Sequence, residues 1–133
     1  MRLRVIGHKL ATVRASILEV FARSALYRWL TVANAALIVL TAFLPAWKIF
    51  PKATSGLFIP LHYDIYFGVD QFGPWQKLFV PAVLGLAMLL VNIVVGALCF
   101  KRERFITWFL LGFTLCVELT LLTAVTFMVL LNL

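Results

Sequence analysis

The sequence predicts an all-α membrane protein with three transmembrane helices, an amphipathic amino-terminal interfacial helix and an ordered outer loop. Three apolar stretches, at residues 30–47, 78–100 and 106–131, are the main reason. Each is long enough to cross a hydrocarbon core of about 30 Å as a helix. Composition agrees, because 64% of the 133 residues are hydrophobic and only 13% are charged, which lies outside the range of soluble domains.

The chain is predicted to form one membrane domain with successive segments. We expect a basic amphipathic helix at residues 1–28, a first span at 29–50, an outer loop at 51–77, a second span at 78–100 and a third at 105–131. The basic region before the first span is too long for a cleaved signal peptide. The first span is therefore expected to be an uncleaved anchor.

The amino-terminal segment has the pattern of an amphipathic helix. Apolar residues recur there at steps of three and four, at Leu3, Ile6, Leu10, Val13, Ile17 and Phe21. Arg4, His8 and Arg14 lie largely off this apolar stripe. Such a helix is suited to lie on an anionic inner leaflet. We expect this position, and the alternative is a cytosolic arm that only sets the topology.

The net charge of +7 is distributed unevenly along the chain. Six Lys and Arg residues precede the first span and three occupy the short turn 101–104, which shares its side of the membrane. Only Lys48, Lys52 and Lys77 border or occupy the loop on the other side. Because basic residues concentrate on the cytoplasmic side, we expect a multi-pass plasma-membrane protein with its amino terminus inside and its carboxy terminus outside. This topology accounts for the charge, so nucleic acid is not an expected partner.

The predicted outer loop holds the densest group of residues that could bind a ligand. Residues 59–75 are rich in aromatic and β-branched side chains with glycine breaks. This composition favours a short hairpin or an extended segment packed on the bundle. In an extended chain His62 and Asp64 point to one side, and Asp70 approaches them if the chain reverses near Gly68.

Three interpretations of His62, Asp64 and Asp70 remain open. The first is a hydrogen-bonded loop cap, in which the imidazole and carboxylates satisfy one another and the backbone. The second is a ligand or divalent-metal site, although the set lacks the second His or Cys of a strong metal site. The third is general-base catalysis, which needs a nucleophile and an oxyanion donor. We favour the cap and expect no metal, no cofactor and no catalytic residue.

The loop also follows a short pattern of residue types. Its members are Pro60, His62, Tyr63, Asp64, Gly68, Asp70, Gly73 and Lys77. This pattern resembles the signature of small bacterial membrane domains found alone or at the front of SdpI-type toxin-immunity and signalling proteins. Here Gly68 comes one residue later than in that signature, Asp64 replaces the commoner Asn, and Lys77 is displaced. The resemblance covers residues 30–90 and implies an architecture, with an immunity- or signalling-like role, more than an activity.

Polar residues inside the predicted spans form a second candidate site. Glu118 lies near the middle of the third span, where a charged carboxylate costs at least ~2.5 kcal/mol. Asn34, Thr41 and Asn92 offer polar groups from the other two spans. A hydrogen bond from protonated Glu118 to one of them is the first interpretation. A proton or cation path is the second, and a contact with a partner subunit is the third.

Small residues form a stripe along the third span. Gly112, Cys116, Thr120 and Ala124 recur every four positions, a spacing that suits close helix packing. At 100° per residue, Glu118 lies on the opposite side of the helix. Packing of this stripe against another span would therefore turn Glu118 away from that contact.

These observations predict a small integral membrane protein without catalysis of its own. The sequence contains no H-E-x-x-H motif, P-loop or nucleophile elbow. We expect a binding, sensing or accessory module that acts through the outer loop, on a membrane-protein partner or within a homo-oligomer. The alternative is an oligomeric proton- or ion-coupled transport element that uses Glu118.

Overall fold

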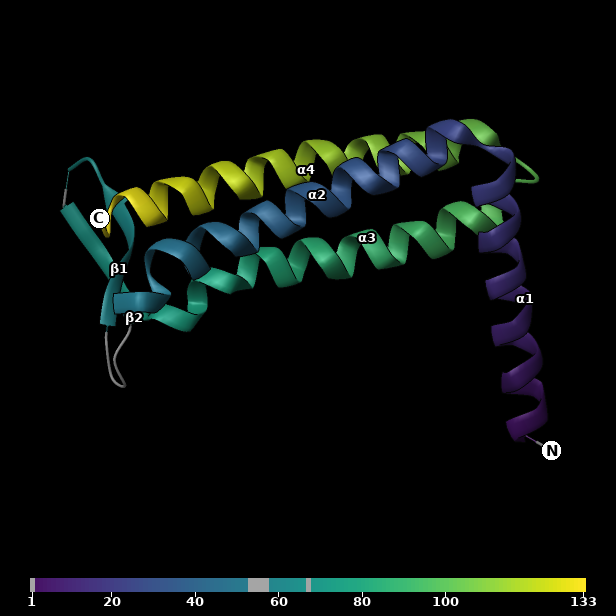
Figure 1. The fold of residues 1–133 in the computed structure, drawn as a ribbon, viewed down its shortest axis with the longest axis horizontal. Coiled ribbons are helices and arrows are strands. Elements are labelled where there is room, and N and C mark those ends of the chain that lie inside the picture. The colour runs from purple at the N-terminus through teal and green to yellow at the C-terminus, as the bar shows by residue number, and fades with distance from the viewer. Residues whose placement is uncertain (1, 53–57, 67) are drawn as a thin grey trace. The chain divides into compact units, whose positions relative to one another are not determined.

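A computed structural model describes residues 2–52, 58–66 and 68–133. Side chains are described at these positions apart from residues 2–9, 52, 63 and 70. Figure 1 shows the elements of the described chain. In order they are α1 (Arg2–Arg23), α2 (Ala25–Lys48), the short 3-10 helix η1 (Phe50–Lys52), β1 (Phe58–Asp64), β2 (Gly68–Pro74), the 3-10 helix η2 (Trp75–Phe79), α3 (Val80–Cys99) and α4 (Arg104–Leu130).

Three stretches of the described chain are long and apolar enough to cross a membrane. They are Ala25–Lys48, Trp75–Cys99 and Arg104–Leu130. The predicted fold class, an all-α membrane protein with three transmembrane helices, is therefore confirmed. The helices begin within about four residues of the predicted starts, and the connection between the first two spans contains a two-stranded sheet.

A serine separates the amphipathic helix from the first span. The hydroxyl oxygen of buried Ser24 accepts a hydrogen bond from the backbone N–H of Tyr27 at 3.2 Å, as a helix N-cap does. The guanidinium of Arg28 donates to the carbonyl of Phe21 at 2.8 Å and so satisfies one of the carbonyls at the end of α1. These contacts start α2 at Ala25, four residues before the predicted start of the span.

The chain divides into two compact units, and we describe each by itself. The basic unit consists of Met1–Ala35 with Ala87–Cys116, and the hairpin unit consists of Ala36–Leu86 with Val117–Leu133. Because the boundaries fall within α2, α3 and α4, each of these helices contributes a segment to both units.

Polar side chains join the helices within the basic unit. The hydroxyl of Tyr27 on α2 donates to the carbonyl of Ile93 on α3 at 2.8 Å. Thr107 on α4 donates in the same way to the carbonyl of Gly96 on α3, also at 2.8 Å. A Cβ at Gly96 would lie 3.2 Å from Cγ2 of Thr107. The missing side chain at Gly96 therefore permits the close approach of α3 and α4.

The hairpin unit contains an antiparallel pair of strands. Asp64 at the end of β1 is paired with Gly68 at the start of β2. Gly68 has a φ of 75°, which glycine adopts without the steric penalty that other residues incur. The register of the two strands shifts on both sides of His62. Such irregularities redirect side chains locally, so the strict alternation of faces does not hold through this part of the hairpin.

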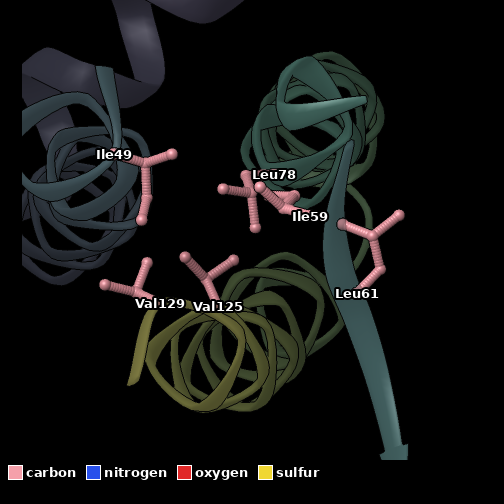
Figure 2. Packing of buried hydrophobic residues seen from close by; sticks show 6 residues of the cluster. All are labelled: Ile49, Ile59, Leu61, Leu78, Val125 and Val129. Atoms are coloured by element: carbon pink, nitrogen blue, oxygen red, sulfur yellow. The ribbon is translucent and has the colours of Figure 1, made fainter. Parts of the chain in front are cut away.

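A small hydrophobic core joins this hairpin to the helices of the same unit. It consists of Ile49, Ile59, Leu61, Leu78, Val125 and Val129. Figure 2 shows Ile49, which directly follows α2, together with side chains of β1, η2 and α4. Leu78 and Val125 have no exposed surface. Full burial of each such side chain contributes about 1.5–3 kcal/mol, so the hairpin is a packed part of this unit.

Candidate functional site

An open groove lies between the hairpin and the last turns of α4. It has a volume of about 600 Å³ and is lined by Leu61, His62, Ala124, Phe127, Met128, Leu130 and Leu131. Its walls are therefore apolar apart from His62, whose side chain is exposed. Apolar walls with a few placed polar groups are typical of ligand-binding sites.

A second, smaller groove shares the same segment of β1. It has a volume of about 380 Å³ and is lined by Leu61, His62, Gln71, Lys77, Val80, Pro81 and Met128. Three of these residues, Leu61, His62 and Met128, also line the larger groove. The Leu61–His62 segment therefore borders two grooves, one apolar and one that includes the amide of Gln71 and the ammonium of Lys77.

Large apolar side chains of the hairpin are exposed beside these grooves. Phe58 and Phe72 are exposed on the two strands, and Ile65 and Tyr66 retain 82% and 87% of their surface in the turn. Exposed aromatic residues that gather on one structural element are typical of interaction surfaces. The hairpin therefore combines a packed base with an apolar rim.

Asp64 stabilises the turn of the hairpin. Its Oδ1 atom accepts a hydrogen bond from the backbone N–H of Tyr66 at 2.7 Å. An aspartate that caps the backbone two residues ahead forms an Asx-turn. Asp64 thus caps the backbone of the turn, and Gly68, with its positive φ, begins β2 directly after it.

His62 and Asp70 stand at neighbouring positions of the two strands. His62 is paired with Gln71, and Asp70 lies between Gln71 and Val69 on β2. The side chain of Asp70 lies outside the described part, so the predicted grouping of all three side chains stays a prediction. Within the described residues no group of three His, Cys, Asp or Glu side chains is arranged to hold a metal ion.

Glu118 is enclosed by the hairpin unit. It has no exposed surface, and among the described residues neither of its carboxylate oxygens has a hydrogen-bond partner. The carboxylate lies against Gly85 of α3, where an added Cβ would be 2.5 Å from both oxygens. Gly85 therefore provides the space that the carboxylate occupies.

The predicted hydrogen bond from protonated Glu118 to another span is not formed among the described residues, and Thr41 and Asn92 hydrogen-bond to other groups. The hydroxyl of Thr41 donates to the carbonyl of Leu37 on its own helix at 2.8 Å. The amide of Asn92 donates to the hydroxyl of Thr114 at 2.7 Å. A threonine in a helix satisfies its hydroxyl most easily on the preceding turn.

Asn34 makes a polar link between two spans. Its Nδ2 atom donates to the carbonyl of Leu30 on the preceding turn at 2.7 Å and to the carbonyl of Leu111 on α4 at 3.2 Å. Its Oδ1 atom is buried without a hydrogen-bond partner among the described residues. Asn34 thus connects α2 to α4 within the basic unit and does not serve Glu118.

The small-residue stripe of α4 includes exposed positions in the described structure. Cys116 and Thr120 are exposed, and a Cβ added at Gly112 would meet no atom within 4 Å in the described structure. Glu118, on the opposite side of α4, is the buried residue. The helix therefore turns Glu118 toward the protein interior. The space beside Gly85 accommodates its carboxyl group, whereas exposure of that group to lipid is costly.

Two residues have structural roles that the sequence did not indicate. Gly85 is a single glycine in an apolar run, and only its position opposite Glu118 gives it a role. Asn132 donates to the carbonyl of Pro60 at 2.8 Å and to that of Met128 at 2.7 Å. It thereby ties β1 to the end of α4. No local signal identifies the contact of Gly85 with Glu118 or the hydrogen bond of Asn132 to Pro60, because each joins residues more than 30 positions apart.

Comparisons with known protein families, with curated proteins and with solved structures give no match for this chain. The resemblance of the hairpin to SdpI-type membrane domains stays a prediction.

Proposed function

We propose that this small membrane protein has no catalysis of its own and acts as a binding or accessory module through its hairpin. The observation that carries the proposal is the groove of about 600 Å³ between β1 and α4. A groove with this lining offers an apolar ligand a large contact area, and His62 offers it a hydrogen bond at one edge. A membrane protein without a binding partner does not require an apolar groove with a histidine at its edge.

The proposed ligand is an apolar segment of a membrane-embedded partner protein. Phe127, Leu130 and Leu131 give the groove the apolar wall that a neighbouring helix would fill. The exposed Tyr66 and Phe72 on the hairpin add aromatic surface, which is enriched at the centres of protein interfaces. A second copy of this chain could fill the groove with the same kind of apolar segment, and the crosslinking experiment below would identify it.

A photocrosslinking experiment tests this proposal. The photoreactive residue p-benzoylphenylalanine is placed at Phe127, in the groove, and at Phe113, which is exposed on the same helix outside it. We expect a discrete protein adduct from position 127 that disappears when Ala124→Trp fills the groove. The same adducts from both positions, or adducts that persist with Ala124→Trp, would contradict the proposal.

We also propose the plasma membrane as the location, with the amino terminus in the cytoplasm and the hairpin outside. The nine-to-three distribution of basic residues supports this orientation. In this orientation the hairpin and its grooves are accessible from outside the cell. The anionic inner leaflet would then contact α1.

A proton- or ion-coupled transport element is the second candidate function. Glu118 supports it, because a fully buried carboxyl group without a hydrogen-bond partner in the described structure requires a proton, water or a cation. A carboxyl group that exchanges such a species could take part in transport. A carboxyl group that stays permanently protonated would instead have a structural role.

Proton flux distinguishes these two roles of Glu118. Proteoliposomes with an internal pH-sensitive dye are tested with the wild type, with Glu118→Gln, and with Glu103→Gln as the control at an exposed glutamate. Flux that is lost only in Glu118→Gln supports transport. If the wild type shows no flux, and a protonated carboxyl infrared band is present that Glu118→Gln removes, then Glu118 is structural.

A further inference from the structure

The basic unit contains a polar pocket that the proposed function does not use. It has a volume of about 380 Å³ and is lined by Glu19, Arg23, Phe100, Lys101 and Arg104. Three cations and one carboxylate therefore surround a space within the range of about 300–1,000 Å³ that small-molecule sites occupy. The pocket has an excess of two positive charges.

Glu19 forms ion pairs with two of these cations. Its Oε2 atom is 2.8 Å from Nζ of Lys101, and its Oε1 atom is 3.2 Å from a guanidinium nitrogen of Arg23. The hydrogen bond from Lys101 lowers the pKa of Glu19 below its ordinary value of 4.5, so Glu19 is ionised at neutral pH. The side chains of Arg23 and Lys101 nevertheless keep 67% and 68% of their surface exposed. They are thus held in position and still accessible to an anion.

Arg104 completes the pocket from α4. Its guanidinium carbon lies 5.3 Å from the centre of the Phe100 ring, a cation–π distance that restrains the side chain. Arg104 is also the first residue of α4, and the first turn of that helix contains no acidic residue. The partial positive charge of this helix end therefore adds to that of the side chains.

The position of the pocket favours a lipid over a soluble anion. It lies where α3 ends at Cys99 and α4 begins at Arg104, and both helices are candidate membrane spans. The ends of such spans lie at the level of the lipid headgroups. Leu98 and Phe105, the neighbours of these helix ends, expose apolar side chains along which acyl chains can lie.

We infer that this pocket binds the phosphate of an anionic phospholipid headgroup. Arg23, Lys101 and Arg104 supply the charge-assisted hydrogen bonds, and Glu19 positions the first two. The bound lipid bridges α1 to the turn between α3 and α4. The inference concerns residues of the basic unit only and is independent of the hairpin groove.

Lipid binding to the full-length protein in mild detergent tests this inference. Native mass spectrometry measures the affinity for phosphatidylglycerol and, as references, for zwitterionic phosphatidylcholine, whose choline offsets the phosphate charge, and for diacylglycerol, which has no phosphate. We expect the wild type to prefer phosphatidylglycerol, and Arg104→Gln and Arg23→Gln each to weaken its binding by about fivefold or more. The matched control is Arg102→Gln, which removes the same charge from an exposed arginine of the same turn that does not line the pocket. It should change the affinity by less than about twofold.

Two outcomes would overturn the inference. Equal losses for Arg102→Gln and Arg104→Gln would mean that only the overall charge of the turn attracts lipid. Displacement of phosphatidylglycerol by millimolar inorganic phosphate would mean that the site takes a soluble anion instead. Circular dichroism verifies that each variant is folded. Arg23→Gln on α1 and Arg104→Gln on α4 test the pocket from two different helices.

Discussion

At the scale of single residues, two glycines have opposite surroundings. Gly85 faces the carboxylate of Glu118, whereas Gly112 faces open space in the described structure. Both lie within helices, where glycine is less favourable than alanine by about 1 kcal/mol. The same substitution should therefore have opposite effects at the two positions.

Gly85→Ala is expected to destabilise the protein by about 1–3 kcal/mol, because its Cβ would overlap both oxygens of Glu118. Gly112→Ala is the matched control and should be neutral or stabilising. Unfolding in mixed micelles measures both. In a Glu118→Ala background, which removes the overlapping atoms, Gly85→Ala should cost much less. Equal costs in both backgrounds would show that Glu118 does not occupy this space.

Gly68 has a different requirement, which concerns the backbone. A Cβ there would meet no described atom within 4 Å, but the φ of 75° is unfavourable for other residues. We expect Gly68→Ala to destabilise the hairpin by about 1 kcal/mol, and Gly68→Asn to cost less because asparagine tolerates this conformation. Amide hydrogen exchange of β1 and β2 measures the difference. Equal protection in all three proteins would contradict the assigned turn.

At the scale of elements, the hairpin and α1 are held by different forces. The hairpin is held by a hydrophobic core around Leu78 and by the amide of Asn132. Helix α1 is connected to the α3–α4 turn through the Glu19–Lys101 ion pair, which is partly exposed. Exposed ion pairs are weak and sensitive to salt. The attachment of α1 should therefore respond to conditions that leave the hairpin unchanged.

This ion pair predicts a dependence on pH. The pKa of Glu19 is lowered in the folded protein by the hydrogen bond from Lys101. The stabilisation is therefore present above pH 4.5 and is lost as the pH falls through the lowered pKa. We expect hydrogen exchange in the carboxy-terminal half of α1 to accelerate in that acid range. Glu19→Gln should exchange faster at neutral pH and lose this response, and an unchanged acid response in Glu19→Gln would exclude Glu19 as its cause.

At the scale of the whole molecule, the orientation in the membrane can be measured directly. With Cys99 and Cys116 replaced by serine, single cysteines are introduced at Tyr66 in the hairpin turn and at Arg102 in the basic turn. We expect a membrane-impermeant thiol reagent to label position 66 in intact cells, and position 102 only after the cells are opened. The reverse pattern would invert the proposed topology.

The sequence alone determined the membrane class, the approximate spans, the reversal of the chain near Gly68 and the amphipathic helix before the first span. These features depend on local composition and periodicity. A span must be continuously apolar to lie in lipid, and helix geometry sets the spacing of residues that share a face. The β-rich segment around His62 was also predicted as a short hairpin, one of two alternatives. Its register irregularities were not predicted, because no pattern of residue types in the segment marks them.

Only the tertiary structure decided which face of α4 turns inward. From sequence, the stripe around Cys116 and the single Glu118 were competing candidates for the packed side. The outcome depends on Gly85, a residue 33 positions away in another helix, which leaves room for the carboxylate. The basic pocket likewise brings Glu19 next to Lys101, although two spans separate these residues in the sequence. Contacts of this kind depend on how separate helices meet, and no local pattern in the chain specifies that.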